Sequence, residues 1–187
     1  MSKVAIVGDP SGTGTFTISA PNGNTDRTLV LPDEAGTVLT SAGVPASAMP
    51  VGSVLQVVNE TLATAISGIS SKTTILSASI TPTSATSKIL VITQCSVGSS
   101  SISNAQAYLG IDRNGVTLPA SSIGGLDTAN GNTSPLNVTY LDSPATTSPI
   151  TYTTWVQRNS GGTSSCAVYS NGALDRRGQL TLMEIAG

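Results

Sequence analysis

The chain has 187 residues, 8 basic and 10 acidic side chains, a net charge of −2 and only 10% charged residues. This balance argues against a nucleic-acid-binding surface, which would show clustered lysine and arginine. The sequence contains no histidine, so a Ser-His-Asp or Cys-His catalytic arrangement within the chain is excluded, and it has no run of about 18 apolar residues that would span a membrane.

Residues 1–40 are predicted to form short strands and turns with almost no core. Thr15–Ser19 alternates apolar and polar residues, which is the period of a half-buried strand, and further short strands are expected at Thr28–Leu31 and Thr37–Thr40. Strands of this length cannot bury enough apolar surface to offset their ordering entropy, so they need a partner. The side chains expected to make virion-docking or trimer contacts are Phe16, Ile18, Leu29, Leu31, Val38 and Leu39.

Residues 41–51 are interpreted as a linker, rich in alanine, serine and proline, with one helical turn around Ala46–Met49. Residues 52–187 are expected to form the second domain. Its predicted strands are Ser53–Asn59, Thr73–Ile80, Lys88–Val97, Ala105–Asp112, Val116–Leu118, Leu136–Leu141, Ile150–Gln157, Ser165–Tyr169 and Gln179–Ile185.

Two of these strands carry more detailed expectations. The Lys88–Val97 segment is apolar on both faces at its start, which predicts a central strand packed on both sides. Asn114-Gly115 follows Ala105–Asp112 where a type I′ hairpin turn would lie. With strands and turns throughout and no amphipathic helix, the second domain is predicted to be an antiparallel β-sandwich, with a jelly roll as first choice.

The Ser121–Pro135 segment is expected to be the longest loop, polar and rich in glycine. Loops of this length in compact domains are often functional. Its Asp127, Asn130 and Asn132 are therefore candidate receptor contacts, and Tyr152 and Trp155 are added because exposed aromatic faces bind sugars. The two aromatic residues point to opposite faces of one strand, so at least one of them is expected in the core.

Enzymatic chemistry has little support in the sequence. Two carboxylates suffice for glycoside hydrolysis, but most of the acidic residues lie in or beside predicted turns, where aspartate usually bonds the backbone. Cys95 and Cys166 have no metal-ligand spacing and are expected to be buried reduced thiols. We therefore expect no catalytic site, no metal and no cofactor.

Several short sequence motifs of the chain also occur in a known protein family. They are Gly12-Thr13-Gly14-Thr15, Ala20-Pro21, Thr28-Leu29-Val30-Leu31-Pro32 and Gly36-Thr37-Val38-Leu39-Thr40, with further patches at 50–56, 80–91, 140–144 and 180–185. Together they resemble the N-terminal module and other parts of tail fibres and fibrous virion proteins of tailed bacteriophages, particularly of marine and cyanobacterial hosts.

The resemblance implies a homotrimeric structural protein of the virion, expected to be a short tail fibre whose distal sandwich contacts the host surface, with a cell-surface glycan as one possible receptor. A capsid decoration protein or head fibre is the alternative, which the small size favours. Other virion proteins are the implied partners. Because the N-terminus has no signal-peptide core, we expect assembly in the host cytoplasm.

Overall fold

The computed structural model describes residues 10–15, 17, 22–26, 28, 44–45, 48–99, 105–126, 133–158, 166–168 and 178–187. The chain divides into two units, Met1–Val38 and Leu39–Gly187. This division lies close to the boundary predicted after residue 40.

In the first unit the described residues are turns, bends and irregular chain. Residues 22–25 form a bend. Thr15, Thr17 and Thr28 are not in strands, so the predicted short strands are absent at these positions. The rest of those strands lies outside the described residues. In the linker, the Ala48 N–H donates to the Pro45 carbonyl at 2.9 Å, which closes a single turn.

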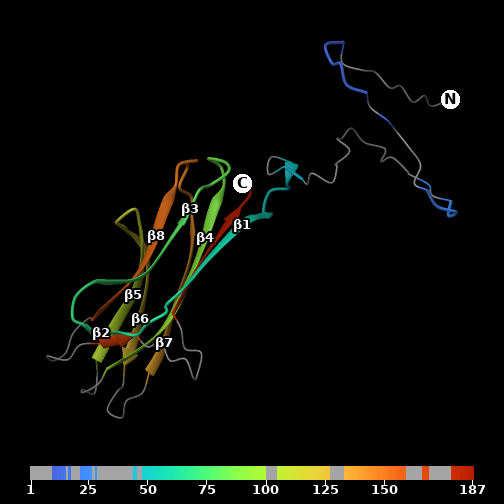
Figure 1. The fold of residues 1–187 in the computed structure, drawn as a ribbon. Helices are drawn as coiled ribbons and strands as arrows, with labels where there is room; N and C mark the ends of the chain where they lie inside the picture. The colour runs from blue at the N-terminus through green and yellow to red at the C-terminus, as the bar shows by residue number, and fades with distance from the viewer. Residues whose placement is uncertain are drawn as a thin grey trace. The chain divides into compact units, whose positions relative to one another are not determined.

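The second unit is all β in its described part (Figure 1). The strands are β1 Val54–Thr61, β2 Ile66–Ile69, β3 Thr73–Ile80, β4 Lys88–Ser99, β5 Ala105–Arg113, β6 Val116–Leu126, β7 Thr133–Asp142, β8 Ile150–Arg158, β9 Cys166–Val168 and β10 Gln179–Ile185. The predicted bounds of β3 and β10 are matched residue for residue, and β2 is a strand that was not predicted.

The strands form two antiparallel sheets. One has the order β3-β8-β5-β6. In the other, β7 pairs with β4 from Ile89 to Gly98 and occupies one edge of that strand. β10 pairs with β4 up to Gln94 and β9 pairs with it beyond, so the two share the opposite edge, while β1 and β2 pair with β10 and β9 in turn.

This topology is a jelly roll. β1 and β2 lie end to end and together occupy one strand position of the sheet, which we call a strand line, and β9 and β10 occupy another. Each sheet therefore has four strand lines, and the chain crosses from sheet to sheet in the order of the eight-stranded, double Greek-key jelly roll. The fold predicted from strand spacing is confirmed.

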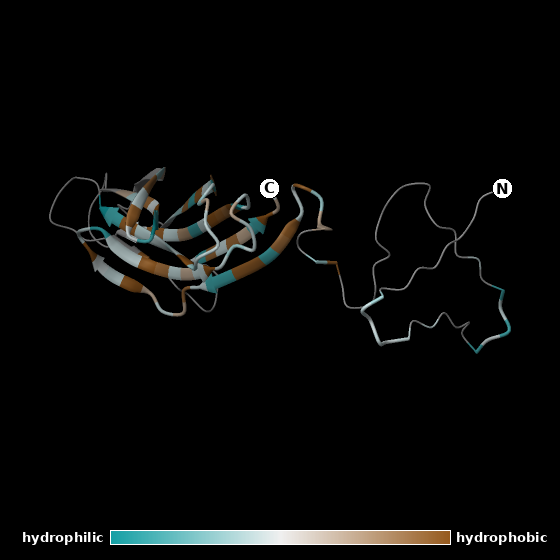
Figure 2. Cartoon of the chain, turned by 90° about the horizontal axis from the view of Figure 1, so that it is seen from above, coloured by the Kyte–Doolittle hydropathy of each residue, from teal (hydrophilic) through white to brown (hydrophobic). Residues whose placement is uncertain are grey.

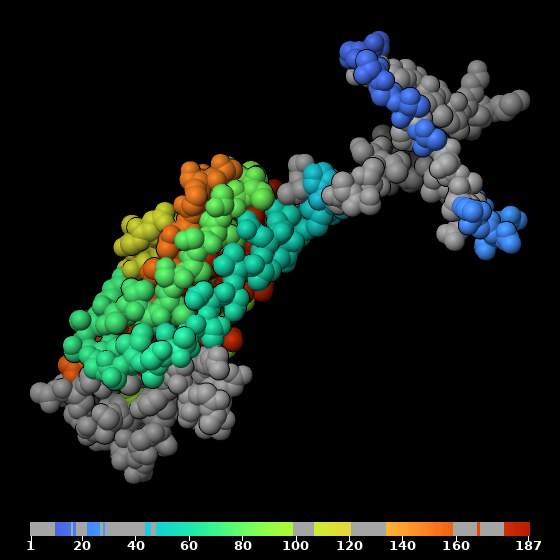
Figure 3. All heavy atoms as spheres, in the orientation of Figure 1, coloured from blue at the N-terminus to red at the C-terminus, as the bar shows by residue number. Residues whose placement is uncertain are grey.

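The core lies between the two sheets and follows the two-residue period of the strands. In β4, Ile89, Val91 and Val97 face inward and are fully buried, as are Leu180 and Leu182 of β10. A polar bridge crosses this core, because the Thr154 hydroxyl donates to Thr93 Oγ1 at 2.9 Å and both residues are fully buried. Along one side of the sandwich, β1 and β3 lie next to each other (Figure 3).

The β5–β6 hairpin has the predicted turn. Asn114 and Gly115 have φ of 48° and 82°, and two successive positive φ values are what a type I′ turn requires. The Asn114 N–H donates to the Thr151 carbonyl at 2.9 Å, and the Thr151 N–H donates to Asn114 Oδ1 at 2.9 Å. These bonds attach the turn to β8.

Two predictions about the second domain are wrong. The Ser121–Pro135 segment is mostly strand, since β6 continues to Leu126 and β7 begins at Thr133, and only 127–132 connects them. β4 is central in its sheet, but it is packed on one side only. Leu90 and Ile92 face away from the core and are half-buried, because no second layer covers this face within the described chain.

Candidate functional site

Tyr152 and Trp155 lie on opposite faces of β8, as predicted, but neither offers an exposed ring. Tyr152 is fully buried in the core, and Trp155 is 7% exposed on the outer face of the β3-β8-β5-β6 sheet. Their assignment as exposed receptor contacts is therefore wrong. The reason differs between them, because Tyr152 is covered by the opposite sheet and Trp155 by its own neighbours.

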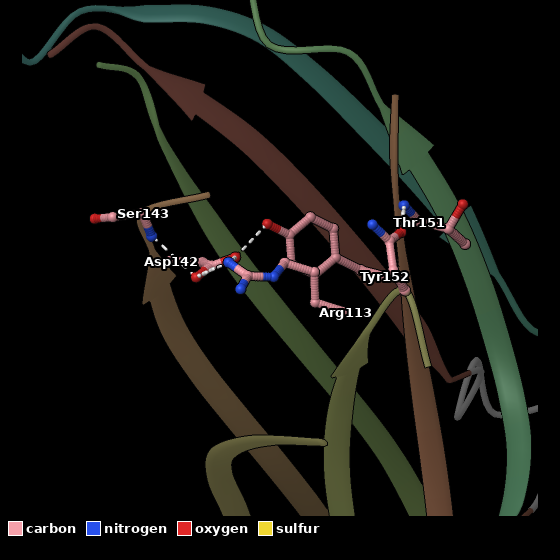
Figure 4. A network of polar contacts seen from close by, with 6 residues as sticks. Arg113, Asp142, Ser143, Thr151 and Tyr152 are labelled. Atoms are coloured by element: carbon pink, nitrogen blue, oxygen red, sulfur yellow. Dashed lines mark hydrogen bonds and ion pairs between the residues drawn. The ribbon is translucent and has the colours of Figure 1, made fainter. Parts of the chain in front are cut away.

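Tyr152 is one member of a polar network between the two sheets (Figure 4). Its hydroxyl donates to Asp142 Oδ2 at 2.6 Å, and Arg113 Nη1 lies 2.9 Å from both oxygens of the same carboxylate. The Ser143 N–H donates to Asp142 Oδ1 at 2.9 Å. Burial, and then the bond to Asp142, raise the pKa of Tyr152 far above its usual value, so it stays a donor. Since Arg113 and Tyr152 belong to one sheet and Asp142 to the other, the network ties the layers together.

Glu184 forms a second buried polar centre. Its side chain is fully buried, and its carboxylate accepts from Gln56 Nε2 at 2.6 Å and from the N–H and hydroxyl of Thr83 at 2.7 and 2.8 Å. Burial raises the pKa of Glu184, but the hydrogen-bond donors around it lower it more, so the net pKa is below its usual value. This carboxylate fastens the β3–β4 connection to β1 and β10.

Trp155 lies against a glycine. A Cβ placed on Gly110 would come within 2.8 Å of Trp155 Cη2, so only glycine leaves room for the ring. Lys72 Nζ lies 4.8 Å from the ring centroid, bonds Asp112 at 2.8 Å and donates to Thr117 Oγ1 at 2.8 Å. The arrangement is an aromatic ring covered by a paired ammonium group, so Trp155 offers no exposed ring on which a sugar could stack.

The described residues include no group of three or more His, Cys, Asp or Glu side chains placed to hold a metal ion. No helix within the described ranges is long and apolar enough to cross a membrane. A hollow of about 340 Å³ beside the end of β10 is lined without any ionisable side chain, by Met49, Leu55, Thr83, Ser84, Ser87, Ala186 and Gly187. Cys95 is buried on the core face of β4.

The strand registers define two opposite ends of the sandwich. At one end the chain enters β1 at Val54, which pairs with Ile185, and Ile185 pairs with Lys88 at the start of β4. At the other end Gly98 pairs with Thr133, Ser99 with Cys166 and Ala105 with Leu126. The β4–β5, β6–β7 and β8–β9 connections therefore all begin at the end opposite the linker. We call these the linker end and the far end.

The remaining predicted site residues lie outside the described residues. They are the docking or trimer candidates Phe16, Ile18, Leu29, Leu31, Val38 and Leu39 and the receptor candidates Asp127, Asn130 and Asn132. Their roles stay predictions.

Sequence reasoning missed the roles of Asp112, Asp142 and Glu184, which were grouped with turn residues or left unassigned. A signal was present for two of them. Asp142 follows Leu136 and Val138 on the same face of β7, and Glu184 follows Leu182 on the core face of β10. A carboxylate at a core position of an alternating strand indicates a buried, paired charge.

No protein-family model and no curated protein matches the chain. Among solved structures, it is similar to chains of infectious bursal disease virus. A T=13 particle of that virus matches with 18% identity over 71% of this chain and 36% of that chain, with a TM-score of 0.42. The Gx strain matches with 15% identity over 82% of this chain and 42% of that chain, also with a TM-score of 0.42. The VP2 subviral particle matches with 18% identity over 71% of this chain and 37% of that chain, with a TM-score of 0.34. This chain thus spans well under half the length of the viral chains it matches.

Proposed function

We propose that the chain is a structural protein of a tailed-bacteriophage virion, a short trimeric tail fibre whose sandwich contacts the host surface. Three features support the proposal: the resemblance of residues 12–40 to a phage fibre module, the jelly-roll topology, and the two ends of the sandwich. Jelly rolls occur in virus capsid and lectin domains, where they work by binding other surfaces.

The observation that carries the proposal is that the linker and the three connections lie at opposite ends of the sandwich. The linker enters at Val54, and three of the strand connections begin at the far end. A fibre needs this separation, because one end must be held by the particle while the other is free to meet the cell. Connecting loops also tolerate sequence change better than the strands that carry them, which suits the recognition of a variable receptor.

The carboxylates of the sandwich support a non-enzymatic role. Asp112 binds Lys72, Asp142 binds Arg113 and Tyr152, and Glu184 binds Gln56 and Thr83. Each of these buried acids is engaged in holding strands or connections together. A glycoside hydrolase needs a pair of carboxylates that face a substrate, one of them able to release a proton.

Competition for host adsorption tests the proposal. Purified protein, incubated with the bacteria that its phage infects, is expected to slow adsorption of the phage in a dose-dependent way. A variant with alanine at Asp127, Asn130 and Asn132 is expected to compete less. Thr147→Ala is the control, because Thr147 is exposed in the β7–β8 connection, which follows Asp142 at the linker end. A protein that never competes but is present on the head of the particle would contradict the tail fibre and support the alternative, capsid decoration.

A further inference from the structure

The outer face of the sheet that contains β4 breaks the usual rule for an antiparallel sheet. Such a sheet alternates apolar residues toward the core and polar residues toward water. Here Val57 pairs with Met183, Met183 with Leu90 and Leu90 with Leu141, which puts one apolar row across β1, β10, β4 and β7. None of the four belongs to the core-facing set.

Two further residues widen this row. Ile92 and Ile185 lie on the same outward-facing positions of β4 and β10, beside Leu90 and Met183. We call the six residues the outer apolar patch. Val57 is 55% exposed and Leu141 49% exposed, while the four between them are partly exposed. Apolar bands are visible along β1 in Figure 2.

The patch is confined to the half of the sheet nearer the linker end. Toward the far end the same outward-facing positions are polar, with Thr61, Gln179, Gln94 and Asn137 in one row. Both halves belong to the same strands and face away from the core. An exposed apolar area beside a polar one on the same face is typical of a contact surface.

Charge indicates what covers the patch. Among the outward-facing positions of β1, β4, β7 and β10 within the described residues, the only charged side chain is Lys88, at the margin. An apolar centre with a threonine, asparagine and glutamine rim and almost no charge is the composition of a protein–protein interface. A surface of this kind is complementary to itself, because two copies meet without like charges opposing each other.

We propose that the outer apolar patch is where the sandwich packs against other copies of this chain. The contact is between sheet faces, which pack about 10 Å apart when their side chains interdigitate. The proposal does not depend on the role of the N-terminal segment, and it holds whether the protein belongs to the tail or to the head of a particle.

Light scattering of the full chain tests this. Wild type is expected to have a mass that is a multiple of 18.7 kDa. Val57→Glu and Leu141→Glu put a charge at each side of the patch and are each expected to weaken association by about 30-fold or more, since a desolvated, unpaired charge is costly at an interface. Val116→Glu is the matched control, because Val116 is 68% exposed but belongs to the other sheet.

Three results would overturn the proposal: a wild-type monomer at all concentrations, association unchanged by both patch variants, or equal weakening by Val116→Glu. The fluorescence of Trp155 reports whether each variant is folded. If the glutamate variants do not fold, maleimide labelling of Val57→Cys and Val116→Cys decides. The proposal requires Val57→Cys to react at least about 10-fold more slowly in the assembled protein, in line with a buried contact, and equal rates would refute it.

Discussion

Gly110→Ala gives the sharpest test of the outer face of the β3-β8-β5-β6 sheet. The added Cβ would lie 2.5 Å from Trp155 Cε2 and 2.8 Å from Cη2, well inside van der Waals contact. Gly110 has no positive φ, so alanine itself fits the backbone. Any effect of the substitution therefore comes from the indole ring, which must move away from the sheet.

The structure allows the loss to be estimated. Overpacking of a filled site costs about 1–3 kcal/mol. The displaced ring also leaves Lys72, whose ammonium lies 4.8 Å from its centroid, and a half-exposed cation–π contact contributes about 0.5–1 kcal/mol. A total of about 1.5–4 kcal/mol corresponds to a lowering of Tm by about 3–16 °C for a domain of this size.

The assay uses the single tryptophan of the chain. Trp155 is 7% exposed, so its emission in Gly110→Ala is expected to shift to longer wavelength as the ring meets water, together with the lower Tm. Gly23→Ala is the control, since a Cβ there meets nothing within 4 Å and should change neither quantity. A Gly110→Ala protein with the Tm and emission of wild type would refute the placement of the ring on Gly110.

Two further predictions concern the buried polar centres. Glu184→Gln is expected to cost about 1.5–3 kcal/mol at pH 7, because an amide cannot accept all the bonds that the carboxylate accepts from Gln56 and Thr83. Since folding lowers the pKa of Glu184, this advantage is complete above its unfolded value of about 4.3 and is lost as pH falls through the folded value. Urea unfolding at pH 7 and pH 3 measures the difference, and an equal gap at both would contradict it. Tyr152→Phe is expected to cost about 1–3 kcal/mol by removing the 2.6 Å bond to Asp142. Because folding raises the pKa of Tyr152, wild type is expected to lose this advantage above about pH 10, so a gap that persists unchanged at pH 11 would argue against the network.

Local patterns were enough to predict much of the fold. The alternation in Thr73–Ile80 and Gln179–Ile185 and the Asn114-Gly115 pair each carry their structural signal within a few residues, and each was predicted correctly. The β-sandwich followed from the spacing of the strands, the turn signals between them and the lack of an amphipathic helix, and the jelly roll was the first choice among sandwiches.

The predictions that were wrong concern residues whose structure depends on partners distant in sequence. Residues 121–126 contain small and polar side chains typical of a loop, and they are strand because β5 pairs with them. Leu90 and Ile92 predicted a second covering layer that the described chain does not supply. Likewise, Tyr152 was predicted as a surface contact because its bonding partner Asp142, which also binds Arg113, comes from a different strand.

The proposed function rests on the two ends of the sandwich, and the proposed self-association rests on its outer apolar patch. The proposed function locates that protein on a phage particle, which a reconstruction of the particle tests most directly. The account predicts a trimer at the tail, with each β-sandwich held through its linker end and its far end directed outward. Particles that lack the protein, that carry it on the head, or that carry it on the tail with the far end buried against the virion would contradict the account.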